Sequence, residues 1–348
     1  MAIEWLAGNR LRGTTAERPS ASLQSVGGWK EVGRTTLASN GDSLDVSSLT
    51  NKRYYMVLLD HQANGSSQPN GRFNSDSGSN YCYRYDNDGS DGTGTSNSNM
   101  KTSNGWNTSE YGVWFISNLA GKEKISLYQC STDRGSGAGT APSRSVTANM
   151  WTSTNAINAI NFAQGGSGGN FKAGSECVVL GYDPADSHTT NFWEELSSVT
   201  TTSSGTISSG TITAKKYLMY NIIGKKASGT GTESARFRFN GDTGSNYAQR
   251  NAINGTHYTY GSQSSANIGG DGNTAGELVF LTGFIVNVAS REKFWLGNAA
   301  FGNSAGNNIG NKGEIACKWT NTSDQITSIE CMGTTFDAGA KMIIWGSD

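Results

Sequence analysis

The chain has 348 residues, a formal net charge of −1 at pH 7 and 16% charged residues, while 46 residues are Gly and 4 are Pro. This length suits about two domains of ordinary size. The near-neutral charge, without a Lys/Arg cluster, argues against nucleic-acid and membrane-surface partners, and no run approaches the roughly 18 apolar residues of a membrane span. We therefore expect a protein made in a cytoplasm that binds neither nucleic acid nor membrane.

The aromatic content separates this chain from disordered ones. Small polar residues dominate the sequence, as they do in disordered segments, but 10% of the residues are aromatic and 9 are Trp. That much ring surface needs to be buried, which requires a folded core. Because few stretches could sustain a helix, the composition predicts a loop-rich, all-β protein.

Residues 1–27 come first and have no counterpart later in the chain. Apolar anchors near the tip of an arm suit docking onto a neighbouring subunit, by strand addition or arm exchange. Packing of the arm along its own first domain is the alternative. The candidate contact residues of this N-terminal arm are three apolar and two basic side chains. They are Ile3, Trp5, Leu6, Arg10 and Arg12.

Landmarks of the first half recur, in the same order, in the second half. The most similar pair is RFNSDSGSNY at residues 72–81 and RFNGDTGSNY at residues 238–247. Six such pairs keep an offset between 163 and 169 residues, which independent turns would not produce. The other five pairs start near residues 29 and 193, 53 and 216, 116 and 285, 151 and 319, and 171 and 336. We infer an internal duplication, with one domain at residues 28–186 and a second at residues 187–348.

Each copy contains short apolar runs separated by clusters of Gly, Ser and Asn, for example YYMVLLD from residue 54. Seven or eight such runs in about 160 residues favour a jelly-roll-like sandwich over an immunoglobulin-like domain of about 100 residues. In RFRFN, the alternation directs Phe237 and Phe239 to the core. The predicted fold is all-β, with two tandem antiparallel β-sandwich domains and an N-terminal arm.

The repeated decapeptide and one acidic loop are the candidate sites for a cation. In the decapeptide, Asn and Asp side chains that cap turn amides are the expected role, and a ligand is the alternative. These residues are Asn74, Asp76, Asn80, Asn240, Asp242 and Asn246. In DNDGSDG, Asp86, Asp88 and Asp91 could ligate calcium, although the loop lacks the downstream Glu of an EF-hand and could simply be solvated. No other cofactor is expected, and the five Cys, without a C-x-x-C pair, predict buried free thiols.

Catalytic patterns are missing from the sequence. His61, His188 and His257 are scattered, and neither H-E-x-x-H nor G-x-S-x-G occurs. We therefore expect a protein that is not an enzyme.

Aromatic side chains are the candidate glycan contacts. Trp106, which has no partner in the other copy, and Tyr258 and Tyr260 are the primary candidates, while Trp114 and Trp295 also supply rings. Trp151 and Trp319 recur in register, which indicates core packing instead. A tandem carbohydrate-binding or adhesion module is therefore an alternative function.

Four segments together resemble virion structural proteins of tailed bacteriophages from marine and other environmental samples, of a tandem jelly-roll type. They are IEWLAGNRLRGTTAERP, GGWKEVGRTTL, RFNGDTGSNY and FDAGAKMIIWG. The resemblance implies a capsid decoration, fibre or tail component, made in the host cytoplasm and located in the virion. It further implies contacts with other virion proteins and a homo-oligomer, with a trimer favoured because one tandem chain can stand in for two subunits.

Overall fold

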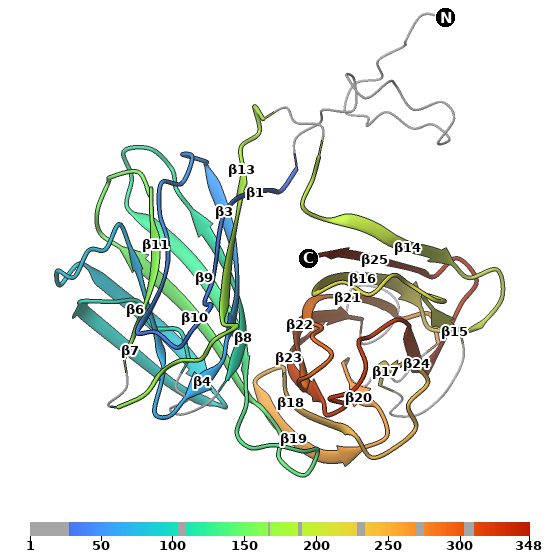
Figure 1. Cartoon of the computed structure of the whole chain (residues 1–348). Coiled ribbons are helices and arrows are strands. Elements are labelled where there is room, and N and C mark those ends of the chain that lie inside the picture. Colours follow the sequence, from blue (N-terminus) through green and yellow to red (C-terminus); the bar gives the residue numbers. More distant parts are fainter. Residues whose placement is uncertain are drawn as a thin grey trace, which may run out of the picture.

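The computed structural model describes residues 28–103, 109–165, 168–186, 190–227, 234–268, 275–302 and 310–348. These residues form strands and turns without a helix, and none of their segments is a helix long and apolar enough to cross a membrane. The strands build two sandwiches that lie side by side (Figure 1). The predicted all-β, two-sandwich fold is confirmed.

The first sandwich pairs a large sheet with a small one. Its strands are β1 (Lys30–Thr36), β2 (Ser43–Val46), β3 (Tyr54–His61), β4 (Ala63–Asn64), β5 (Pro69–Phe73), β6 (Tyr81–Asn87), β7 (Ser90–Asn97), β8 (Glu110–Ser117), β9 (Lys124–Thr132), β10 (Ser143–Trp151), β11 (Ile160–Gln164), β12 (Asn170–Phe171) and β13 (Glu176–Tyr182). The large sheet has the order β1-β13-β3-β8-β9-β10-β6-β7, and the small sheet has the order β2-β11-β5.

The second sandwich repeats this arrangement. Its strands are β14 (Glu194–Thr200), β15 (Gly205–Ser208), β16 (Tyr217–Lys225), β17 (Arg236–Phe239), β18 (Tyr247–Ile253), β19 (Thr256–Gln263), β20 (Ala266–Asn267), β21 (Leu278–Val286), β22 (Lys293–Phe301), β23 (Asn311–Trp319), β24 (Ile329–Phe336) and β25 (Lys341–Ser347). The large sheet has the order β14-β25-β16-β21-β22-β23-β18-β19, strand for strand the order of the first. Such identity of topology is what a duplicated domain leaves behind.

Each sandwich encloses its own core between the large and the small sheet. Alternation along the strands points every second side chain inward, so Phe237 and Phe239 are fully buried, as predicted. Trp151 and Trp319 also lie in the two cores, which confirms the interpretation of their recurrence.

Strand β7 is too polar to be recognised as an apolar run, whereas β19 contains the aromatic run HYTYG at residues 257–261. β7 and β19 are the outer strands of hairpins, and the turns before them contain Asp88-Gly89 and Asn254-Gly255. These four residues have φ of 52°, 92°, 51° and 84°, the left-handed values that a tight type I′ hairpin turn needs. Polar strands such as β7 explain why the described residues form more strands than the predicted seven or eight per copy.

A third apolar cluster lies between the sandwiches and includes residues of both large sheets. The outer face of each large sheet, the face turned away from its small sheet, is therefore partly an interface with the other sandwich. The fully buried members of this cluster at its centre are Leu58, Tyr111, Val113, Val178, Leu180 and Tyr217.

Candidate functional site

The repeated decapeptide forms the same hydrogen-bonded turn in both sandwiches. The Asp76 carboxylate accepts hydrogen bonds from Gly78 N (2.8 Å), Asn80 Nδ2 (2.9 Å) and Trp151 Nε1 (2.7 Å). The matching Asp242 accepts from Gly244 N (2.8 Å), Asn246 Nδ2 (2.9 Å) and Trp319 Nε1 (2.7 Å). These carboxylates tie the turn to a core tryptophan, so their role is structural, as the capping interpretation predicted.

The remaining amides of the decapeptide are also used internally. Asn74 Oδ1 accepts hydrogen bonds from the backbone N–H groups of Asn158 (2.8 Å) and Ala159 (3.1 Å), and Asn240 Oδ1 does the same with Thr327 (2.8 Å) and Ser328 (3.1 Å). Each of these amides fastens the decapeptide turn to the loop that precedes β11 in the first copy or β24 in the second. The set is therefore built into the fold twice.

The acidic loop considered as a possible calcium site contacts arginines. Asp86 pairs with Arg144 (2.5 Å), and Asp88 pairs with Arg134 (3.2 Å) and with Arg250 of the second sandwich (3.2 Å). Asp91 lies opposite Asp86 in the β6-β7 hairpin. Within the described ranges, no group of three or more His, Cys, Asp or Glu side chains is placed to hold a metal ion.

The aromatic candidates divide into buried and exposed rings. Trp114 and Trp295 are fully buried, so the idea that they contact sugars is wrong; both belong to strands whose inward face carries the core. Tyr258 and Tyr260 on β19 are 38% and 39% exposed, with parallel rings 6.4 Å apart. Trp106 lies outside the described residues, as do Ile3, Trp5, Leu6, Arg10 and Arg12 of the N-terminal arm.

Two polar pairs are buried inside the first sandwich. Tyr128 Oη donates a 2.5 Å hydrogen bond to Glu110 Oε1, and His61 Nε2 lies 3.1 Å from Ser67 Oγ. Burial raises the pKa of Glu110 to about 7, even though the hydrogen bonds oppose the shift, and burial lowers the pKa of His61 to about 3. Both groups are neutral over much of the acidic range, as a dry core demands.

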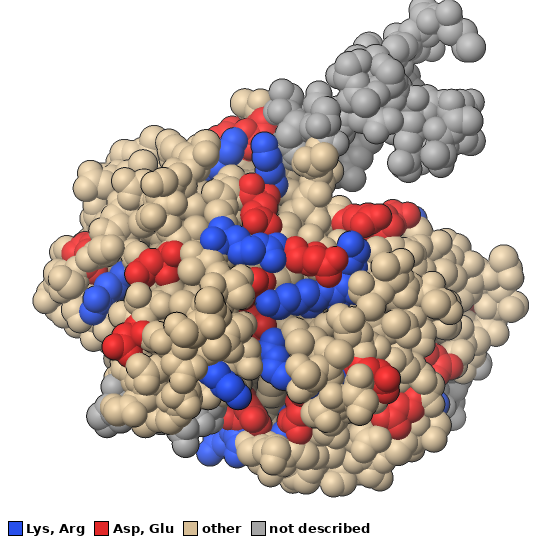
Figure 2. All heavy atoms as spheres, in the orientation of Figure 1, with Lys and Arg blue, Asp and Glu red and all other residues tan. Residues whose placement is uncertain are grey.

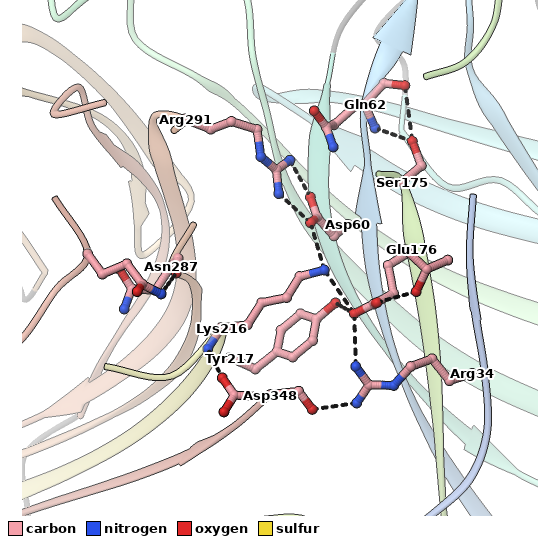
Figure 3. A network of polar contacts seen from close by, with 12 residues as sticks. Arg34, Asp60, Gln62, Ser175, Glu176, Lys216, Tyr217, Asn287, Arg291 and Asp348 are labelled. Carbon is pink, nitrogen blue, oxygen red and sulfur yellow. Dashed lines mark hydrogen bonds and ion pairs between the residues drawn. The ribbon is translucent and has the colours of Figure 1, made fainter. Parts of the chain in front are cut away.

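A polar network closes one end of the interface between the sandwiches (Figure 3). The Arg291 guanidinium makes a bidentate contact with Asp60, at 2.8 and 2.6 Å. Glu176 accepts hydrogen bonds from Lys216 Nζ (2.9 Å) and Tyr217 Oη (2.8 Å). Asp60 and Glu176 belong to the first large sheet, and their three partners belong to the second sandwich.

Electrostatics hold this network in its charged form. Burial alone would raise the pKa of Glu176, but hydrogen bonds from Thr36 and Lys216, together with the positive charge of Lys216, keep it below its usual value. Arg34 adds a further contact to Glu176 at 3.3 Å and donates to the Asp348 backbone oxygen at 2.5 Å. The C-terminus is thereby fastened to the first sandwich.

Ion pairs also flank the far side of the interface. Arg144 reaches Glu314 of the second sandwich at 2.5 Å, and the fully buried Lys318 lies 3.5 Å from Asp133 and 3.0 Å from Glu292. Lys/Arg and Asp/Glu side chains alternate along a central band where the two sandwiches meet (Figure 2). Several ion pairs of the described residues therefore join the two halves of the chain.

Part of each large sheet's outer face is free of this interface and apolar. On the first sandwich, Phe115, Ile125 and Leu127 are 38%, 62% and 57% exposed. With Trp29, Tyr54 and Tyr182 they line an open groove of about 540 Å³. On the second sandwich, Ile223, Leu278 and Phe280 form an exposed patch on the paired strands β16 and β21.

We name these surfaces the first free face (Phe115, Ile125, Leu127) and the second free face (Ile223, Leu278, Phe280). Sequence reasoning missed both, although a signal for an apolar outer face was present in the neighbouring strand β3, which contains the run YYMVLL. A run that is apolar at every position indicates a strand buried on both faces. Clustered exposed apolar side chains of this kind mark surfaces that bind a partner.

No protein-family model and no curated protein matches this chain. Among solved structures, human GIVD cytosolic phospholipase A2 matches this chain with 8% sequence identity and a TM-score of 0.15. The match covers 77% of this chain and 33% of the phospholipase. The Ail attachment protein of Yersinia pestis gives 6% identity, 77% and 98% coverage, and a TM-score of 0.14. The mavirus major capsid protein gives 6% identity, 99% and 93% coverage, and a TM-score of 0.14. This chain thus spans about a third of the phospholipase, and all three scores are too low to bear on its fold or function.

Proposed function

We propose that this chain is a non-enzymatic structural component of a virus particle that self-associates, as a capsid decoration, fibre or tail protein. The observation that carries self-association is the pair of free apolar faces on the two large sheets. Surfaces of this kind need a partner in water. The virion as the place of assembly, with production in a host cytoplasm, is supported by the resemblance of the N-terminal and repeat segments to phage virion proteins.

The N-terminal arm is the second contact that we assign to assembly. Its apolar anchors suit docking onto another subunit or another virion protein. Trp29, near the start of the described residues, and Phe192, which follows the junction between the copies, both pack into the cluster between the sandwiches.

Size-exclusion chromatography with light scattering, followed by electron microscopy of the purified protein, tests the proposal. We expect a trimer or larger oligomer with a regular outline. A monodisperse monomer at every concentration would contradict it.

A tandem carbohydrate-binding or adhesion module is the second candidate function. The stacked, exposed rings of Tyr258 and Tyr260 favour it, since parallel aromatic faces can pack against sugar rings. Retention of a monomer on immobilised glycans, lost in Tyr258→Ala and Tyr260→Ala, would select this function over assembly.

A further inference from the structure

The two free faces correspond to surfaces that are already buried within the chain. Aligned through the duplication, Phe115, Ile125 and Leu127 match Phe284, Phe294 and Leu296. The second set is only 8%, 8% and 2% exposed, because it packs against the first sandwich. The same positions are thus covered in one copy and open in the other.

The reverse holds for the other half of the interface. Tyr111 and Asp60 of the first large sheet are buried against the second sandwich. Their counterparts are Phe280 and Ile223 of the second free face. The first sandwich therefore contributes one half of its outer face to the interface, and the second sandwich contributes the other half.

An interface that joins different halves of two equivalent units is head-to-tail. Such an interface leaves one half unpaired on each end unit, and a further copy can repeat the contact until a ring closes or a filament grows. We propose that the second free face of one chain docks on the first free face of a second copy of this chain. This inference rests on the proposed self-association and names the surfaces that carry it.

The chemistry of the groove on the first free face, as well as its position, suits the second free face of another copy. Its walls are aromatic and aliphatic, and the patch that it receives presents Phe280, Ile223 and Leu278. Exposed Lys225 and Lys341 lie at the edge of this patch, opposite Leu278 and Ile223 on the paired strands. Phe115 already touches Phe284 at 6.0 Å between ring centroids, so the first free face continues directly into the established interface. An aromatic side chain such as Phe280 is the natural anchor for such a groove.

The ion pairs of the internal interface are not repeated between chains. Glu176 is replaced by Lys341 and Lys216 corresponds to Arg53, so two positive charges would approach where an acid and a base meet within the chain. The contact between chains is therefore mainly apolar. Added salt screens that repulsion, so association should persist or tighten as the NaCl concentration rises.

Single substitutions on the two faces test the inference. Leu127→Lys removes the first free face and Phe280→Lys removes the second. Each should weaken association about thirtyfold or more and give a monomer in sedimentation equilibrium. Tyr258→Lys is the matched control, because Tyr258 is exposed to the same extent as Phe115 but lies outside both faces.

Mixing the two variants decides whether the contact is head-to-tail. A 1:1 mixture retains one intact pair of faces, so it should form a dimer with one chain of each variant. A mixture that stays monomeric, or association lost only in Leu127→Lys, would overturn the inference in favour of contact between like faces. If Leu127→Lys melts far below the wild type, Ile125→Lys takes its place.

The failure of this inference is distinguishable from failure of the proposed function. A wild-type oligomer whose mass neither substitution changes would overturn the head-to-tail contact, while the structural role would stand on the N-terminal arm. A wild type that is monomeric at every concentration would overturn both.

Discussion

Truncation of one core ring in the second sandwich tests the strand register. Phe239 is fully buried and lies edge-on to Trp295 at 4.9 Å and to Trp319 at 5.7 Å, with Tyr247 at 6.1 Å. Phe→Ala in a core costs about 3–5 kcal/mol, and each favourable ring pair contributes about 0.5–1.5 kcal/mol beyond area burial. We expect Phe239→Ala to lower the free energy of unfolding by about 4–5 kcal/mol, because several ring contacts are lost together.

Urea unfolding followed by tryptophan fluorescence measures this loss, since Trp295 and Trp319 report on the affected core. Phe73→Ala is the matched variant, because Phe73 holds the equivalent position, stacked on Trp114 at 5.2 Å. The two variants should lose similar stability. A loss below about 1 kcal/mol for Phe239→Ala would refute the inward orientation of this strand.

Three further substitutions test the interface, the buried polar group and the repeated turn. Arg291→Met leaves the buried Asp60 carboxylate without its bidentate partner, so unfolding in urea should become easier by about 2–4 kcal/mol; an unchanged midpoint would deny the ion pair a role. Glu110 keeps its proton up to about pH 7 in the folded state but releases it near pH 4.5 in the unfolded chain. The stability that its protonated form contributes is therefore lost as pH rises through this range. In the unfolded chain His61 binds a proton near pH 6.5, whereas in the folded state it stays neutral down to about pH 3. The stability contributed by neutral His61 is therefore lost as pH falls. The two effects cancel between about pH 4.5 and 6.5. In His61→Gln only the Glu110 effect remains, so the free energy of unfolding should fall by about 1.4 kcal/mol per unit of rising pH in this range. Denaturation series that give the same slope for the variant and the wild type would contradict this. Ser75→Gly should raise the free energy of unfolding by about 0.5–1 kcal/mol, because Ser75 has φ of 56° where the second copy carries glycine. Calorimetry that shows no gain in stability would argue against backbone strain at Ser75.

The head-to-tail arrangement gives the duplication a physical consequence. A single sandwich that exposed both apolar halves of its outer sheet face could associate with further copies without limit. Joining two copies in one chain buries half of that surface permanently and adds ion pairs, such as Asp60 with Arg291, that only the internal interface possesses. In the proposed assembly the remaining halves contact another copy, and that contact lacks these ion pairs, so it should separate more easily than the internal interface.

Local patterns were sufficient for the fold class and for much of the inner core. Alternation in RFRFN placed Phe237 and Phe239 correctly, and the shared offsets revealed two equivalent sandwiches, because neighbouring residues alone decide strand alternation and turn geometry. Even the capping role of Asp76 followed from its place in a tight turn. Polar strands such as β7 escaped detection, since their backbone pairing depends on a hairpin partner and not on apolar side chains.

The outer faces were decided only by tertiary structure. Asp60 and Arg291 are 231 positions apart, and no local pattern predicts that such residues will meet. In the acidic loop, Asp86 pairs with Arg144 of the neighbouring strand β10, and Asp88 pairs with Arg250 because the second sandwich packs beside it. Which half of an apolar sheet face is covered depends on where a second domain docks, and that is set by the summed contacts of both surfaces, not by the residues of either strand.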